Sequence, residues 1–128
     1  MKLIVCLDDN NGVMFNKRRQ SRDRVLIENM IELCKDKKLY TNEYSVSLFP
    51  ENAVEIFDNI EDVEKSYCFA ENFTVNEEYV DEIIVYKWNR VYPADVHFNI
   101  DLGNWTLTES VDFEGSSHEK ITREIYRR

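Results

Sequence analysis

Five cations lie within eight residues in the first quarter of the chain, and they form what we call the basic cluster. Its members are Lys17, Arg18, Arg19, Arg22 and Arg24. Arginine binds phosphates and carboxylates through paired hydrogen bonds, so the basic cluster is a candidate site for an anionic ligand or an acidic protein. The alternative reading is that these cations only offset the charge of acidic residues nearby.

The histidines and cysteines do not indicate metal chemistry. His97 and His118 are the only histidines, and neither belongs to an HxH, HxxxH or CxxC arrangement, so we expect no metal site. The cysteines, Cys6, Cys34 and Cys68, are widely spaced among apolar neighbours. This setting predicts buried thiols in a reducing compartment rather than disulfides.

The composition indicates one globular domain that does not bind nucleic acid. The chain has 128 residues and a formal net charge of −9, from 16 Lys plus Arg and 25 Asp plus Glu. A chain of this length predicts a single domain, here residues 1–128, and its acidity is unsuited to a phosphate backbone. Only 3 glycines are present, which matters because loops that cradle phosphates need glycine where the backbone approaches the ligand.

We expect no targeting signal at the N-terminus. The first apolar run, Leu3 to Leu7, ends at Asp8 and is too short for the core of a signal peptide. No later segment approaches the roughly 20 apolar residues that a membrane helix requires. We therefore expect a cytoplasmic protein with no membrane contact.

The elements that would position the basic cluster alternate between strand and helix patterns. The apolar run 2–7 predicts a strand covered on both faces. Ser21 can cap a helix with Asp23 in its first turn and apolar residues at helical spacing over 26–34. Residues 38–45 predict a second strand, parallel to the first through a right-handed crossover.

The second half is richer in strand patterns. Pro50 can open a short helix that reaches Phe57, and weak helical turns are expected at 60–65 and 74–79. Residues 66–70 predict a short strand and 81–92 a long one. The last quarter predicts an antiparallel hairpin, with alternating apolar residues over 105–113 and 121–125 on either side of Gly115-Ser116-Ser117. The sum is an α/β fold with a mixed sheet, parallel strands first and the antiparallel hairpin at one edge.

Several strings of this chain resemble the dihydrofolate reductase family. The opening Leu3-Ile4-Val5-Cys6-Leu7-Asp8-Asp9-Asn10 is similar to the family's "LIVAxDxN", and Asp81-Glu82-Ile83-Ile84-Val85 is similar to its "DEIYLT" strand. Val96-His97-Phe98, ahead of Asp101 and Trp105, and the terminal Glu124-Ile125-Tyr126-Arg127-Arg128 match the family's "HFP" approach and final strand. The resemblance spans both ends, roughly half of the chain, and implies a dihydrofolate-reductase-like mixed sheet.

The family's cofactor motifs are absent at the matching positions. A Gly-Arg-x-Thr motif normally follows the second strand, and this chain has Asn42, Glu43, Tyr44 and Ser45 there. The family's Gly-Gly after the penultimate parallel strand is replaced by Ala70, Glu71 and Asn72. Glutamates at these places would repel a phosphate, so we expect no cofactor and the loss of conventional NADPH binding.

One catalytic feature of the family has a counterpart. The resemblance implies that Asp23 occupies the position of the carboxylate that helps protonate a pterin, although a helix cap is the simpler interpretation. The threonine that supports this carboxylate in the family is replaced by Tyr86. The other ligand-binding candidates that the resemblance implies are Cys6, Leu7, Asn16, Arg18, Arg19 and Ile27.

Three functional hypotheses follow. The first is a divergent dihydrofolate-reductase-like domain that has lost NADPH binding and works as a ligand-binding or interaction module. The second is an NAD(P)H-dependent reductase of a pterin-like substrate that uses Asp23. The third is a small regulatory protein that binds an acidic partner through Arg18, Arg19, Arg22 and Arg24. The partner expected is a small molecule or an acidic protein.

Overall fold

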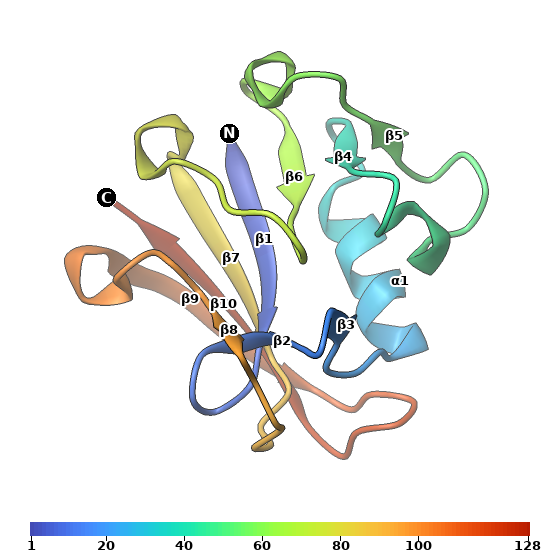
Figure 1. The fold of residues 1–128 in the computed structure, drawn as a ribbon, viewed down its shortest axis with the longest axis vertical. Helices are drawn as coiled ribbons and strands as arrows, with labels where there is room; N and C mark the ends of the chain where they lie inside the picture. The colour runs from blue at the N-terminus through green and yellow to red at the C-terminus, as the bar shows by residue number, and fades with distance from the viewer.

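A seven-stranded mixed sheet forms the centre of the protein (Figure 1). The structure is a computed structural model that describes all residues, Met1 to Arg128. The strand order is β5-β4-β6-β1-β7-β10-β9, with parallel pairing from β5 to β7 and antiparallel pairing of β10 with both β7 and β9. The strands are β1 Lys2–Leu7, β4 Leu39–Thr41, β5 Glu55–Ile56, β6 Tyr67–Phe69, β7 Glu82–Lys87, β9 Thr106–Phe113 and β10 Ile121–Arg127. The predicted mixed sheet with a C-terminal hairpin is confirmed.

The central strand β1 separates two cores. Successive side chains of a strand point to opposite faces. Ile4 therefore packs in the core beneath the helix, together with Ile84. Leu3 and Val5 belong to the core on the other face. Burial on both faces explains why β1 is a continuous apolar run.

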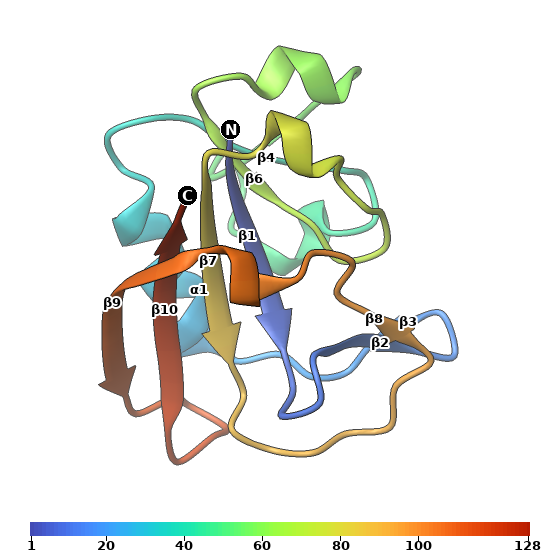
Figure 2. The same ribbon diagram turned by 90° about the vertical axis from the view of Figure 1, so that its left-hand side faces the viewer.

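One helix, α1 Arg24–Leu33, covers one face of the sheet (Figure 2). Leu26, Ile27 and Met30 recur at helical spacing, and all three are buried against this face. The residue that caps the helix is Asp23, not Ser21 as predicted, because its carboxylate accepts the N–H groups of the first turn. The helix is too short to cross a membrane, and no other helix is long and apolar enough to do so.

A second, three-stranded sheet lies beyond the carboxyl end of β1 (Figure 2). Its order is β3-β2-β8, from β2 Gly12–Phe15, β3 Arg18–Arg19 and β8 Val96–His97. Asn16 and Lys17, with φ of 52° and 62°, make the tight turn between β2 and β3. Two consecutive residues with positive φ match the twist of a two-residue hairpin. Four 3₁₀ turns complete the fold: η1 Val46–Leu48, η2 Ile60–Val63, η3 Glu77–Tyr79 and η4 Leu102–Asn104.

Three predicted elements differ from the structure. The helix expected from Pro50 is a turn, in which the Ala53 N–H donates to the Pro50 carbonyl, followed by strand β5. The free edge of β4 accounts for this, because its backbone groups pair with those of Glu55 and Ile56. The strand expected over 38–45 ends at Thr41, and the one expected over 81–92 ends at Lys87, shortly before the positive φ of 59° at Asn89.

The cysteines lie buried as predicted for Cys34 and Cys68, and Cys6 is half-buried. Burial raises the pKa of both Cys34 and Cys68 to about 12. Because the thiolate is the reactive species, we expect neither thiol to react with Ellman's reagent in the native protein at about pH 8. Both should react after unfolding in guanidinium. Rapid native labelling of a Cys6→Ala variant would contradict the prediction.

Candidate functional site

The turn after β6 holds a buried acid. Glu71 is only 9% exposed and receives the Arg19 guanidinium side-on, with Nε 2.9 Å from Oε1 and Nη2 3.0 Å from Oε2. The Ser45 hydroxyl donates to Oε2 over 2.6 Å. Both carboxylate oxygens therefore accept charge-assisted hydrogen bonds from Arg19. The paired geometry is the one in which arginine binds carboxylates and phosphates. We call Arg19, Ser45 and Glu71 the anion cluster.

Arg19 is fixed from the other side by Tyr44. The Arg19 backbone N–H donates to the Tyr44 hydroxyl over 3.1 Å, and the guanidinium carbon lies 4.8 Å from the centre of the Tyr44 ring. The hydrogen bonds to Glu71 raise the pKa of Arg19 further. A guanidinium that packs on an aromatic ring, on a strand whose backbone is also fixed, is well placed to bind an anion, and here that anion is the chain's own Glu71.

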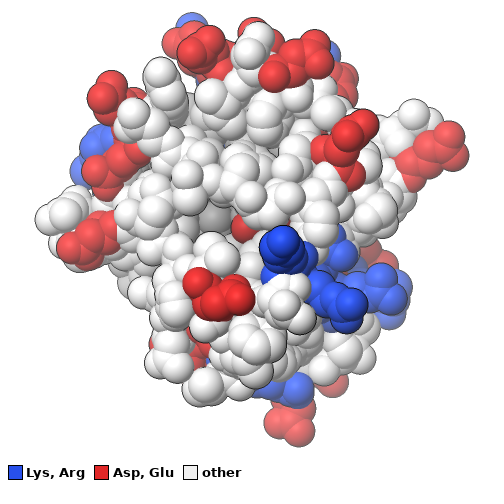
Figure 3. Space-filling model, viewed as in Figure 1, with Lys and Arg blue, Asp and Glu red and all other residues white.

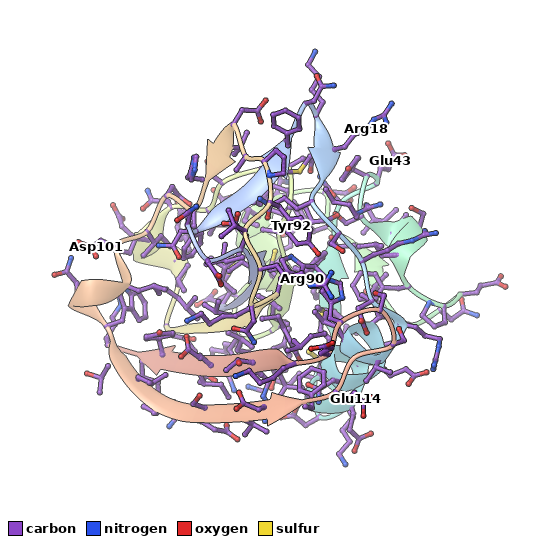
Figure 4. All side chains as sticks on the ribbon, turned by 90° about the horizontal axis from the view of Figure 1, so that it is seen from below. Arg18, Glu43, Arg90, Tyr92, Asp101 and Glu114 are labelled. Carbon is purple, nitrogen blue, oxygen red and sulfur yellow. The ribbon has the colours of Figure 1, made fainter.

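The other predicted cofactor positions divide into two groups. Asn42 donates from Nδ2 to Asn72 Oδ1 over 2.7 Å, which joins the segment after β4 to the turn after β6. Ala70 is buried beside Glu71. Glu43, in contrast, is exposed and has no ion pair, and Figure 4 shows it on the outside of the molecule near Arg18. Glu43 is therefore not part of the anion cluster.

The carboxylate of Asp23 is fully enclosed, with 0% side-chain exposure. Its Oδ1 accepts the backbone N–H groups of Val25, Leu26 and Ser116 over 3.0, 3.2 and 2.9 Å. Its Oδ2 accepts the Ser117 N–H over 2.8 Å and lies 3.0 Å from His118 Nδ1. The carboxylate thus ties the start of α1 to the 115–118 turn of the hairpin, and the sequence offered no sign of this long-range contact.

Glycine is needed in this turn because the turn approaches Asp23 closely. A Cβ at Gly115 would collide with the Asp23 carboxylate and lie 2.8 Å from Cδ1 of Ile121. In phosphate-binding loops, glycine lets the backbone come close to the phosphate. Here Gly115 lets the backbone come close to the Asp23 carboxylate and enclose it.

His118 continues the Asp23 network. In the neutral ring the proton belongs on Nδ1, because a carboxylate only accepts, and Nε2 then accepts from Tyr92, 2.9 Å away, or Ser21, 3.2 Å away. Trp88 stacks on the ring at 4.6 Å between centres. Ser21, His118 and Asp23 follow the hydrogen-bond order of a hydrolase triad. The adjoining cavity measures about 20 Å³, room for no more than a water molecule.

The enclosed Asp23 makes stability depend on pH. Burial alone would raise the pKa of Asp23, but the N–H groups of Ser116, Ser117 and Leu26 and the His118 ring hold it well below its usual range. A carboxyl with a lowered folded pKa stabilises the protein above its unfolded pKa of about 3.9 and loses that contribution as the pH falls toward the folded value. We expect the gap in unfolding free energy between wild type and Asp23→Asn to shrink below about pH 4. Urea titrations across the acid range measure it, and a constant gap would contradict the assignment.

The remaining ligand-binding candidates do not gather in one cleft. Cys6 and Ile27 line the small cavity beside Asp23, as Arg19 does. Leu7 lies in the core on the opposite face of the sheet. Tyr86 is fully buried, and its hydroxyl donates to Asn29 Oδ1 over 2.7 Å. Asn16 and Arg18 are exposed on the β2–β3 hairpin. The candidates therefore do not share one cleft, although Asp23 and Ile27 also line a wider, open cavity of about 700 Å³ beside α1.

The basic cluster is also divided. Arg19 turns inward to Glu71, and Arg24 pairs with Glu28 at 2.8 Å one turn along α1. Arg18 and Arg22 are exposed and have no ion pair. Lys17 borders a separate cavity. No three His, Cys, Asp or Glu side chains lie together so as to hold a metal ion.

This separate cavity, of about 480 Å³, lies on the sheet face opposite α1. Figure 3 shows a hollow on the face seen in that view, with basic side chains on one side and acidic side chains beside it. Leu3 and Val5 of β1 form part of its lining, together with residues of β2, β8 and the 70–75 segment. Sequence patterns could not reveal it, because five segments, Tyr44 from the segment after β4 included, contribute to it.

Comparisons with known proteins support the fold. No family model matches the chain, and no curated protein sequence matches it. Among solved structures, the chain is similar to dihydrofolate reductase from Enterococcus faecalis, complexed with NADP(H) and RAB-propyl. The TM-score is 0.70 at 12% identity, and the match covers 99% of this chain and 95% of that one. The chain therefore has the dihydrofolate-reductase-like fold that its terminal strings predicted.

Proposed function

We propose that this protein is a divergent dihydrofolate-reductase-like protein that does not bind NADPH in the family's way and works as a ligand-binding module. The observation that carries the proposal is the anion cluster. Glu71 follows β6, where the resemblance implies a glycine pair beside the cofactor phosphates. Its carboxylate already occupies the donors that a phosphate would need.

The electrostatics of the anion cluster support this proposal. A phosphate brought to Arg19 would have to displace Glu71, and the displaced carboxylate would remain nearby as a like charge. Separating the pair would also leave Glu71, 9% exposed, without its cation. Such separations of buried ion pairs are costly.

The state of Asp23 argues against the reductase alternative. A carboxylate that serves a pterin must have oxygen atoms free to bind the ring. Here four backbone N–H groups and the His118 ring already engage both oxygens. The similar Enterococcus faecalis structure was solved with NADP(H), and the different chemistry at Glu71 and Asp23 is the reason that we do not extend this cofactor to the present chain.

Calorimetric titration of the wild-type protein with NADPH tests the proposal. We expect no saturable heat and no oxidation of NADPH in the presence of dihydrofolate. The Enterococcus faecalis enzyme serves as the positive control for both assays. Saturable binding that stabilises the protein in a thermal melt would overturn the proposal, because a ligand that binds the folded state must raise its melting temperature.

A further inference from the structure

We infer that the cavity of about 480 Å³ opposite α1 binds a small molecule that has an apolar body and a single anionic group. The inference rests on the proposed function only in taking the ligand to be something other than NADPH. The volume is within the range of about 300 to 1,000 Å³ typical of small-molecule sites. A cavity of this size on a chain of 128 residues is a substantial feature of its surface.

The lining of the cavity indicates that the body of its ligand is apolar. Leu3 and Val5 are 1% and 3% exposed and belong to the core on the sheet face opposite α1. Above them, loops and strands supply aromatic and aliphatic side chains from three further segments. The apolar lining comprises Leu3, Val5, Val13, Met14, Ala70, Phe73, Val75, Val96 and Phe98. Such a lining favours an aromatic or aliphatic group, which loses water contact when it enters.

The charged residues at the rim of the cavity indicate the charge of its ligand. Lys17 lines it, makes no ion pair, and lies exposed on the tight β2–β3 turn. Glu71 also reaches the lining, but its charge is matched by Arg19. Asp95 is the other acidic lining residue, and its Oδ2 accepts the Asn16 N–H over 3.0 Å. Lys17 is therefore the one cation at the rim free to meet an anionic group, while Asp95 disfavours such a group on its own side.

Two probes with the same apolar body test this assignment. Anilinonaphthalene sulfonate carries an anionic group, and phenylnaphthylamine lacks it. We expect the sulfonate to bind the wild-type protein more tightly. Lys17→Met should weaken sulfonate binding about fivefold, as expected for one charge-assisted contact at a partly open rim, and leave the neutral probe unchanged. Lys120→Met makes the same charge change on an exposed lysine outside the cavity and should alter neither affinity.

Two further variants locate the site and its charge. Val96→Phe fills the cavity from a position that is 45% exposed, so the protein should fold and bind both probes less well. Asp95→Asn keeps an acceptor for the Asn16 N–H and should strengthen sulfonate binding alone. Equal affinities for the two probes, or sulfonate binding unaffected by Lys17→Met and Val96→Phe, would overturn the inference. Displacement of the sulfonate by NADPH would support the cavity as a site and overturn the proposed function instead.

Discussion

The variant Asp23→Ala should lose about 3 to 5 kcal/mol of unfolding free energy. The substitution removes the cap of α1 and leaves the N–H groups of Ser116 and Ser117 without their acceptor. A lost cap alone costs about 1 kcal/mol. The larger figure follows because Asp23 is fully enclosed and its partners lie at the far end of the chain. Urea unfolding monitored by circular dichroism measures the loss.

A matched control separates the buried network from capping in general. Asp101 caps the short turn η4 by accepting the Gly103 N–H over 2.9 Å, and it is exposed. Figure 4 shows Asp101 and Glu114 near opposite ends of β9, so the control is remote from the 115–118 turn. Asp101→Ala should cause only a small loss. Similar losses for the two variants would refute the structural role assigned to Asp23.

The variant Glu71→Ala should be the second most destabilised, by about 2 kcal/mol. It leaves Arg19, 22% exposed, without its carboxylate, and it removes the acceptor of the Ser45 hydroxyl. The partial exposure of Arg19 places the effect below the 3 to 5 kcal/mol typical of fully buried pairs, because water can reach the unpaired cation.

Glu43→Ala is the matched control for Glu71→Ala. It removes the same charge from the segment between β4 and η1, but Glu43 is exposed and makes no ion pair. We expect its unfolding free energy to stay close to that of the wild type. A loss at Glu43 comparable to the loss at Glu71 would show that net charge, rather than the anion cluster, determines stability here.

The sequence predicted the parts of the fold whose patterns are local and strong. The continuous run of β1 and the alternating hairpin of β9 and β10 have one dominant interpretation each. The stretch from Pro50 to Phe57 was misread because its pairing with β4 depends on a neighbour far along the chain. Short elements with such partners are decided by tertiary contacts rather than by propensity.

The candidate site was predicted less completely, for a related reason. The sequence identified Glu71 as a charge of the wrong sign for a phosphate, yet it could not show that Arg19 from the basic cluster would meet it. Asp23 was recognised as a helix-start acid, but its contact with His118 joins residues at opposite ends of the chain. No sequence pattern predicts the apolar cavity, because its lining residues come from short stretches of several strands and loops.

If Glu71 fills an anion site of the protein itself, removing its carboxylate should allow pyrophosphate to bind there. Thermal melts of wild type, Glu71→Ala and Glu43→Ala are compared with pyrophosphate and with sodium chloride at equal ionic strength. We expect pyrophosphate to raise the melting temperature of Glu71→Ala, whose Arg19 and Ser45 are free to bind it, and to leave the other two unchanged. An equal rise in the wild type, or no rise in Glu71→Ala, would show that Glu71 does not occupy an anion site.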